Sequence, residues 1–181
     1  MKNFLITLGI IVLLIIGAWE IYLYNTKSHS PEADVTYEAN NLLIHIYYNR
    51  PFKKGREIFG GLVPYGKVWR TGANEASIFE TNKDLLFKGK TLKAGKYTLW
   101  SIPNEQTWTI IFNSEYGQWG ISNGEANRDS KNDVLLVDAH ALIQDKELEQ
   151  FTIAIENVGT EQELLLIWDK TLVSIPFTAA Q

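Results

Sequence analysis

The chain has 181 residues, of which 45% are hydrophobic and 21% are charged, and its formal net charge is −4. This length suits one globular domain together with a short N-terminal segment and leaves little room for two full domains. The acidic balance provides no bulk attraction for nucleic acid, so we expect no nucleic-acid partner. Because the chain has no cysteine, disulfides, thiolate nucleophiles, lipid-modified cysteines and cysteine-ligated metals are excluded.

The N-terminal segment is apolar over residues 4–24, with Glu20 as its one charged residue. As a helix it would span about 30 Å at a rise of ~1.5 Å per residue, which is enough to cross the hydrocarbon region of a bilayer. Aromatic side chains that suit a membrane interface cluster at its end: Trp19, Tyr22 and Tyr24. The segment therefore predicts one transmembrane helix, with the membrane as the partner of residues 4–24.

A cleaved signal peptide is the alternative, because Lys2 followed by a short apolar run also fits a signal sequence. A small-x-small cleavage motif is missing, since Ile16 stands at the third position before a cut after Ala18. We favour a single-pass anchor over residues 1–24, with the N-terminus in the cytoplasm and the rest in the periplasm or outside the cell.

Residues 25–34 are polar and lack apolar periodicity, which predicts a flexible tether. The remaining residues, 35–181, show short alternating runs separated by turn residues, and we expect an all-β domain, an antiparallel β-sandwich or jelly roll of about nine or ten strands. Asn40 and Asn41 suit a tight hairpin turn. Further strands are expected at 85–87, 91–92, 76–81, 97–102, 107–113, 134–139, 151–156, 164–168 and 172–177. One short helix is expected at 141–150.

The long connection over residues 49–75 is the most informative part of the chain for function. Its many apolar side chains argue against disorder, and folded loops of this length are often functional. We predict a ligand site that combines an arginine fork, an amide, a carboxylate and flat indole surfaces, suited to a small polar or glycan-like ligand. The candidate residues are Arg50, Arg56, Trp69, Arg70, Asn74, Glu75, Trp100 and Trp119.

Two other interpretations of this segment remain open. Arg70 and Glu75 could form an internal ion pair, with Asn74 capping loop backbone groups, which would make the polar loop purely structural in an envelope protein. Alternatively, a metal-independent hydrolase or lyase would use Glu75 as acid or base and Arg70 to hold an anion. The sequence leaves the catalytic residues and the oligomeric state undetermined.

Metal and cofactor signatures are missing from the sequence. His29, His45 and His140 have no second histidine at metal-ligand spacing. The acidic, amide-rich loop that contains Asp129 and Asp133 matches no standard calcium loop. Nucleophile-elbow, phosphate-loop and dinucleotide motifs are also missing, so we expect no metal and no cofactor.

Five stretches resemble a bacterial family, domain-of-unknown-function family 2911. They are residues 55–75 (GREIFGGLVPYGKVWRTGANE), 94–99 (AGKYTL), 102–103 (IP), 108–113 (WTIIFN) and 118–120 (QWG). The resemblance covers about residues 50–177, and the length of its first motif makes it specific. It implies an exported β-rich bacterial domain, and the family brings no established activity or catalytic residues. Family members often begin with a signal peptide, so an uncleaved anchor would be a departure.

Overall fold

A computed structural model describes residues 2–180 of the chain as one long helix followed by a mostly β body. The helix is α1 (Lys2–Ser28), and the short 3-10 helix η1 (Ser130–Asn132) precedes the longest strand. The strands are β1 (Glu32–Ala39), β2 (Leu42–Asn49), β3 (Ser77–Thr81), β4 (Leu85–Phe87), β5 (Lys90–Leu92), β6 (Gly95–Ile102), β7 (Thr107–Asn113), β8 (Ile121–Ser122), β9 (Glu125–Ala126), β10 (Asp133–Val158) and β11 (Glu161–Ala179).

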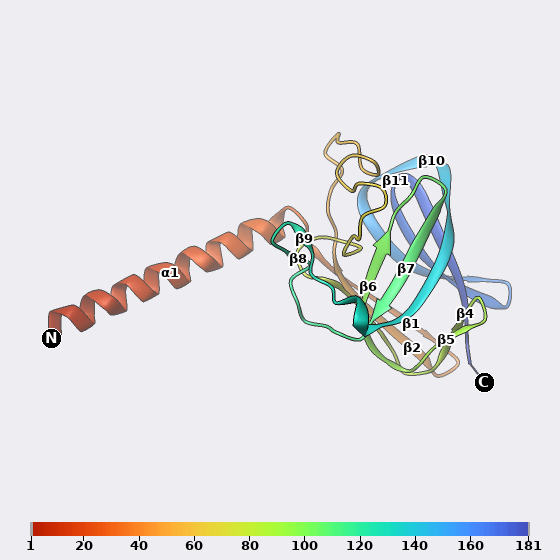
Figure 1. Ribbon diagram of the computed structural model, residues 1–181, viewed down its shortest axis with the longest axis horizontal. Helices are drawn as coiled ribbons and strands as arrows, with labels where there is room; N and C mark the ends of the chain where they lie inside the picture. The colour runs from red at the N-terminus through yellow and green to blue at the C-terminus, as the bar shows by residue number, and fades with distance from the viewer. Residues whose placement is uncertain (1, 181) are drawn as a thin grey trace.

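Nine strands form one sheet in the order β1-β2-β3-β6-β7-β10-β11-β4-β5, and every neighbouring pair is antiparallel. The predicted antiparallel all-β fold is confirmed at this level. The nine strands form one continuous sheet, β8 and β9 pair only with each other as a separate hairpin, and residues 2–180 show no sandwich or jelly roll. The reason is β10, whose first part pairs with β7 and whose later part pairs with β11, so one strand joins both halves (Figure 1).

The helix expected at 141–150 is wrong, because these residues belong to β10. Ala141 and Leu142 pair with Val173 and Leu172 of β11. The register then shifts between Ile143 and Thr152, and the in–out alternation of side chains is lost there. A β-bulge of this kind removes the two-residue period that identifies a strand in sequence.

The hairpin predicted at Asn40 and Asn41 is present. Asn40 and Asn41 join β1 to β2 with φ values of 50° and 62°. Two consecutive positive φ values define the turn type that follows the natural twist of paired strands, and asparagine tolerates them better than most residues.

The sheet curves around one large apolar core. The Tyr48 hydroxyl on β2 accepts a hydrogen bond from the Ile153 amide on β10 at 2.9 Å, and Tyr37 on β1 donates to the Asn157 side chain at 2.6 Å. These contacts join the first strands to the far part of β10. The largest fully buried core side chains include Trp108, Trp168, Phe79, Phe87, Phe112, Phe151 and Phe177.

A second, smaller apolar cluster contains Trp100 of β6 and Ile111 of β7 and lies apart from the main core. Val68 and Ala126 pack against it. The segment that links β2 to β3, residues 50–76, and the β8–β9 hairpin therefore meet over this cluster, and their meeting place holds the candidate site.

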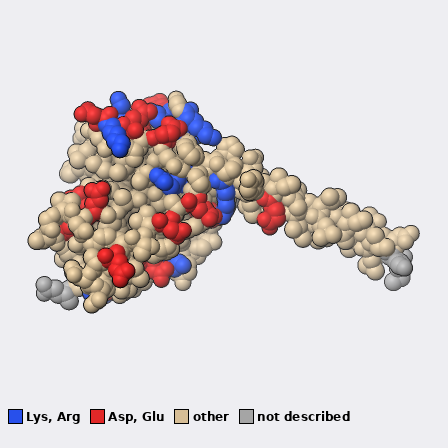
Figure 2. Space-filling view, turned by 180° about the vertical axis from the view of Figure 1, so that it is seen from behind, with Lys and Arg blue, Asp and Glu red and all other residues tan. Residues whose placement is uncertain are grey.

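Helix α1 extends from the domain as a single rod (Figure 1) and its surface is almost free of charge (Figure 2). An 18-residue window within Asn3–Ser28 has a mean hydropathy of 2.5 and no buried residue, so this helix is long and apolar enough to serve as a signal sequence or as a membrane anchor. The helix continues to Ser28 and β1 begins at Glu32, so most of the stretch expected as a tether, residues 25–34, has regular structure.

Candidate functional site

The segment over residues 50–76, called the crossing segment below, is folded onto the sheet as expected. Trp69 and Ser101 of β6 exchange two backbone hydrogen bonds, of 2.7 and 2.9 Å. The crossing segment thus adds a short bridge to the sheet at Trp69 and places the next residues, including Arg70 and Asn74, at the end of the domain close to α1.

A tight turn after Trp69 depends on Gly72. Its φ is +157°, and a Cβ at this position would lie 2.9 Å from Ser77 Oγ and 3.0 Å from the Asn49 carbonyl oxygen. The Gly72 carbonyl accepts a hydrogen bond from the Trp69 indole at 3.0 Å. Asn74 follows with a φ of 58°, within the left-handed region that asparagine tolerates. The backbone therefore reverses sharply between Trp69 and Glu75.

A cavity of about 1040 Å³ lies where the crossing segment, the β8–β9 hairpin and the end of α1 meet. Arg70, Asn74 and Val68 line it from the crossing segment, and Gly120 lines it from the residues before β8. The helix contributes Tyr22, Asn25 and Thr26. Three parts of the chain that are distant in sequence therefore line one cavity.

Arg70 is the most unusual side chain of this lining. Its Nε is buried and has no hydrogen-bond partner, and among residues 2–180 its guanidinium forms no ion pair. Burial lowers the pKa of Arg70 from its ordinary value, although an arginine remains protonated at neutral pH. The proposed internal ion pair between Arg70 and Glu75 is wrong, because Glu75 has other partners.

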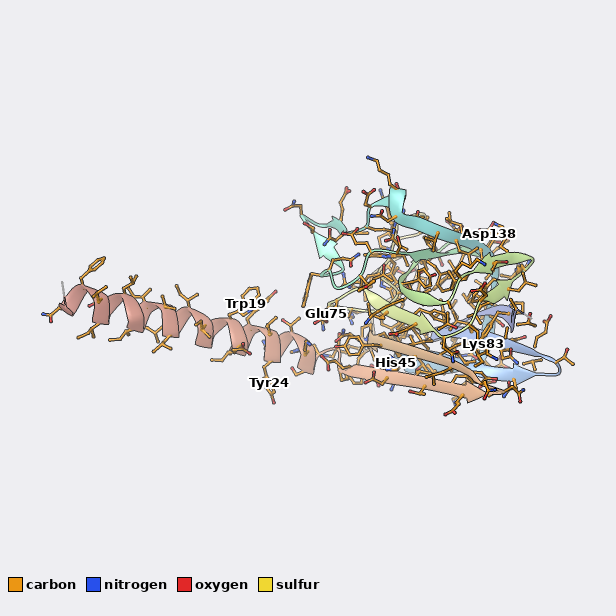
Figure 3. All side chains as sticks on the ribbon, turned by 90° about the horizontal axis from the view of Figure 1, so that it is seen from below. Trp19, Tyr24, His45, Glu75, Lys83 and Asp138 are labelled. Atoms are coloured by element: carbon orange, nitrogen blue, oxygen red, sulfur yellow. The ribbon has the colours of Figure 1, made fainter. Side chains whose placement is uncertain are left out.

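Glu75 binds the end of α1. One carboxylate oxygen lies 3.1 Å from Lys27 Nζ, and the other accepts a hydrogen bond from the Asn49 amide at 2.9 Å. The Asn74 amide in turn donates to Asn49 Oδ1 at 3.2 Å, and Lys27 also contacts Glu32. Figure 3 shows Glu75 at the end of the domain that faces the helix. Glu75 thus connects the helix to the crossing segment and is not a residue of the cavity lining.

Of the other predicted arginines, one lines the cavity and one holds the fold together. Arg56 lines the cavity and donates to the Phe52 and Lys53 carbonyls at 2.5 and 3.0 Å. Arg50 donates instead to the Phe151 carbonyl and to Thr152 Oγ1, at 3.0 and 2.8 Å, and binds the crossing segment to β10.

The three tryptophans predicted at the site have different positions. Trp69 lines the cavity but is only 8% exposed, and its ring stacks on Trp168 at a centroid distance of 6.0 Å. Trp100 is fully buried and donates to Thr98 Oγ1. Trp119 is 36% exposed and bridges the backbone of Glu75, outside the lining. Of the eight candidates, the structure brings Arg56, Trp69, Arg70 and Asn74 to the cavity.

Sequence reasoning missed several lining residues. Lys54 and Lys67 lie inside the crossing segment and could have been included, because they flank the predicted arginines. The sequence contained no pattern that marked Arg128, Asn25 or Thr26 as cavity residues. Their positions depend on how α1 and the β8–β9 hairpin pack together.

No group of three or more His, Asp or Glu side chains within residues 2–180 is arranged to hold a metal ion. His45 pairs with Asp34 at 2.8 Å on an exposed strand face. In the acidic loop, Asp133 forms an ion pair with Arg128 and accepts a hydrogen bond from Asn113. These groups already have protein partners.

The structure therefore shows a mostly β domain that follows an apolar N-terminal helix, with a cavity where the helix and the domain meet. Residues 30–177 match the family described as "Protein of unknown function (DUF2911)", and the chain belongs to this family. The resemblance found in the sequence is therefore confirmed. No curated protein and no solved structure matches the chain.

Proposed function

We propose that this protein is a single-pass membrane-anchored receptor-like domain, lying in the periplasm or outside the cell, that binds a small polar ligand in the cavity beside α1. The observation that carries the proposal is Arg70, a half-buried side chain that lines the cavity of about 1040 Å³ and whose buried Nε has no hydrogen-bond partner among residues 2–180. Ligand cavities are typically ~300–1,000 Å³ and hold a few placed polar groups, which this cavity matches.

Arg70 supports ligand binding because its Nε is buried without a hydrogen-bond partner, which is costly. Leaving a buried polar group unsatisfied costs about 1–3 kcal/mol, and more for a charged group. A ligand with acceptor oxygens would satisfy the guanidinium and recover part of that cost on binding. The Asn74 amide group, which is buried beside it and also lines the cavity, offers a further polar contact.

The glycan-like ligand is supported less well than a polar one. Sugar recognition would use an accessible indole face. Trp100 is fully buried, Trp119 lies outside the lining, and Trp69 is occupied by core aromatic rings. The hydrolase or lyase alternative also has no supporting observation, because its acid or base, Glu75, faces Lys27 and Asn49 instead of the cavity.

The end of α1 is joined to the domain by the contact between Lys27 and Glu75. This pair joins the last turn of the apolar helix to the crossing segment, and the helix also supplies part of the cavity wall. The helix residues that make these contacts, Tyr22 to Lys27, all lie after Ala18, so they would remain in place after a cut there. The anchor is favoured instead by the length of the apolar helix and by the missing small-x-small motif before Ala18.

The proposal is tested on the full chain in a nonionic detergent, by measuring the unfolding temperature with panels of neutral sugars, carboxylates and phosphates. A ligand at 100 times its Kd stabilises the folded state by about 2.7 kcal/mol, which is readily measured. Thr26→Trp places a large uncharged side chain in the cavity wall and should abolish the shift, whereas Thr26→Ser should retain it. The proposal fails if no compound stabilises the wild-type chain or if Thr26→Trp responds like Thr26→Ser.

A further inference from the structure

The charge of the cavity lining is opposite to that of the chain. The chain has a formal net charge of −4, yet its cavity has one carboxylate in the lining, that of Glu125. Five cationic residues share this lining: Lys54, Arg56, Lys67, Arg70 and Arg128. In a domain with an acidic surface, this concentration of positive charge points to a ligand that supplies the missing negative charge.

Most of these cations lack a carboxylate partner. Arg128 forms an ion pair with Asp133, but Lys54, Arg56 and Lys67 form none within the described part of the chain, and neither does Arg70. The neighbouring Lys53, which does not line the cavity, shows the contrast, since it binds both Glu147 and Asp169 at 2.8 and 2.7 Å. Carboxylates are thus available nearby but do not neutralise the lining.

Arg70 is also held in place by its surroundings. Its Cδ lies so close to the Gly120 backbone that a Cβ there would come within 2.1 Å, and the Gly120 amide donates to the Asn74 carbonyl at 2.9 Å. A guanidinium that is held by its stem and free at its nitrogens is preorganised to bind the two oxygens of a carboxylate or phosphate.

We infer that the ligand of this cavity carries an oxyanion, a phosphate or carboxylate group, that binds to Arg70, with Arg56 and Lys67 adding attraction from the rim. This inference rests on the proposed function, because it names the chemical class of the ligand of that same cavity. It also explains why an acidic protein gathers unpaired cations at the one place where α1 and the β domain meet.

Two sources could present the same oxyanion. The helix residues of the wall, Asn25 and Thr26, follow directly after the apolar residues 4–24, so the cavity would open within about 10 Å of the membrane surface at ~1.5 Å per helical residue. At that place both a dissolved anion and the headgroup of an anionic lipid can reach Arg70. The experiment therefore has one arm for each source.

The experiment uses the full chain in nanodiscs, with the unfolding temperature of the β domain as the readout. In the first arm, inorganic phosphate is added in increasing concentration to the chain in phosphatidylcholine nanodiscs. Ionic strength is kept constant, with chloride as the balancing anion. The second arm compares phosphatidylcholine nanodiscs with nanodiscs that contain phosphatidylglycerol. A phosphate-dependent shift identifies a dissolved anion, and a shift with phosphatidylglycerol identifies a lipid headgroup.

Three variants give the inference its test. Arg70→Ala should weaken the response at least about tenfold, since hydrogen bonds to charged groups contribute about 1.5–3 kcal/mol. Lys67→Ala, which changes an exposed side chain and should fold normally, should weaken the response several-fold. Lys83→Ala removes a positive charge at the end of the domain far from α1 (Figure 3) and should respond like the wild type.

Each other outcome overturns a defined part of the proposal. The oxyanion inference is wrong if neither phosphate nor phosphatidylglycerol shifts the wild type, or if Arg70→Ala and Lys67→Ala both respond as Lys83→Ala does. If neutral sugars stabilise the wild type in the Thr26-controlled screen while oxyanions do not, the proposed binding function stands and the oxyanion inference alone falls. If neither class of compound binds, both fall.

Discussion

The backbone of Gly120 lies against the side-chain stem of Arg70, so closely that a Cβ at Gly120 would stand 2.1 Å from Arg70 Cδ and 2.9 Å from Arg70 Cβ. Residues fifty positions apart are thus matched in shape, and the absence of a side chain at one is what lets the other reach the cavity. Gly120 lies in the QWG motif and Arg70 in the longer motif that identified the family, so this contact joins two of the motifs.

Gly120→Ala should displace Arg70 and destabilise the domain by about 1–3 kcal/mol, the usual cost of an added methyl group in a packed site. Denaturant unfolding measures this change. In an Arg70→Ala background the cost should be smaller, because the contact with Cδ is gone. If Gly120→Ala lowered the free energy of unfolding equally in both backgrounds, a glycine would be required there by the neighbouring Asn74 carbonyl and not by the Arg70 side chain.

Lys27 and Glu75 should stabilise the junction of α1 and the domain by about 0.5–1 kcal/mol, since both side chains are about one-third exposed (35% and 29%) and exposed pairs contribute little. A double-mutant cycle with Lys27→Met and Glu75→Gln measures the coupling. It should decrease when salt is raised from ~0.01 M to ~1 M, because ions screen partly exposed charges. A coupling near zero at low salt would contradict the contact.

Trp69→Ala should destabilise the domain by about 3–5 kcal/mol, the range found for large buried aromatic residues. Trp69 is 8% exposed and its ring contacts those of Phe59, Trp108, Phe151 and Trp168. Trp119→Ala is the matched control, and at 36% exposure its cost should be clearly smaller. Denaturant midpoints compare the two, and similar values would mean that Trp69 is not a core residue.

The mature protein should retain its N-terminal helix. The expected result is an intact mass that includes residues 1–24 and a β domain that stays with the membrane fraction after a high-salt wash. N-terminal sequencing of the protein from its native membrane provides an independent check. A mature chain that begins after Ala18 would identify a cleaved signal peptide, and it would remove Tyr22 and the cavity wall from their membrane setting.

Local patterns predicted much of the architecture. The alternating runs around Thr107–Asn113 and the asparagine pair at Asn40 and Asn41 indicated strands and a hairpin, because side-chain direction and turn geometry depend on neighbours in sequence. The same reasoning failed over residues 141–150, where a β-bulge in β10 disturbs the period. Local patterns also could not predict that the nine strands form one continuous sheet, because the length of β10 depends on its pairing with two different strands, β7 and β11.

The candidate site shows the same division. Residue type alone marked Arg70, Asn74 and Arg56 as candidate ligand-binding groups, because guanidinium and amide chemistry is a property of the side chain itself. Sequence could not decide that Glu75 would bind Lys27 and not Arg70, or that Trp100 would be buried. Those outcomes depend on which surfaces meet when the crossing segment, the β8–β9 hairpin and α1 pack together.

By itself, the sequence determined the apolar N-terminal helix, the antiparallel β character of the domain and its family, since each depends on composition or on short-range periodicity. Only the tertiary structure decided which polar groups share the cavity, because contacts such as that of Arg70 with Gly120 join residues far apart along the chain. A partner chosen by packing is specified by the whole fold, and no local pattern carries that information.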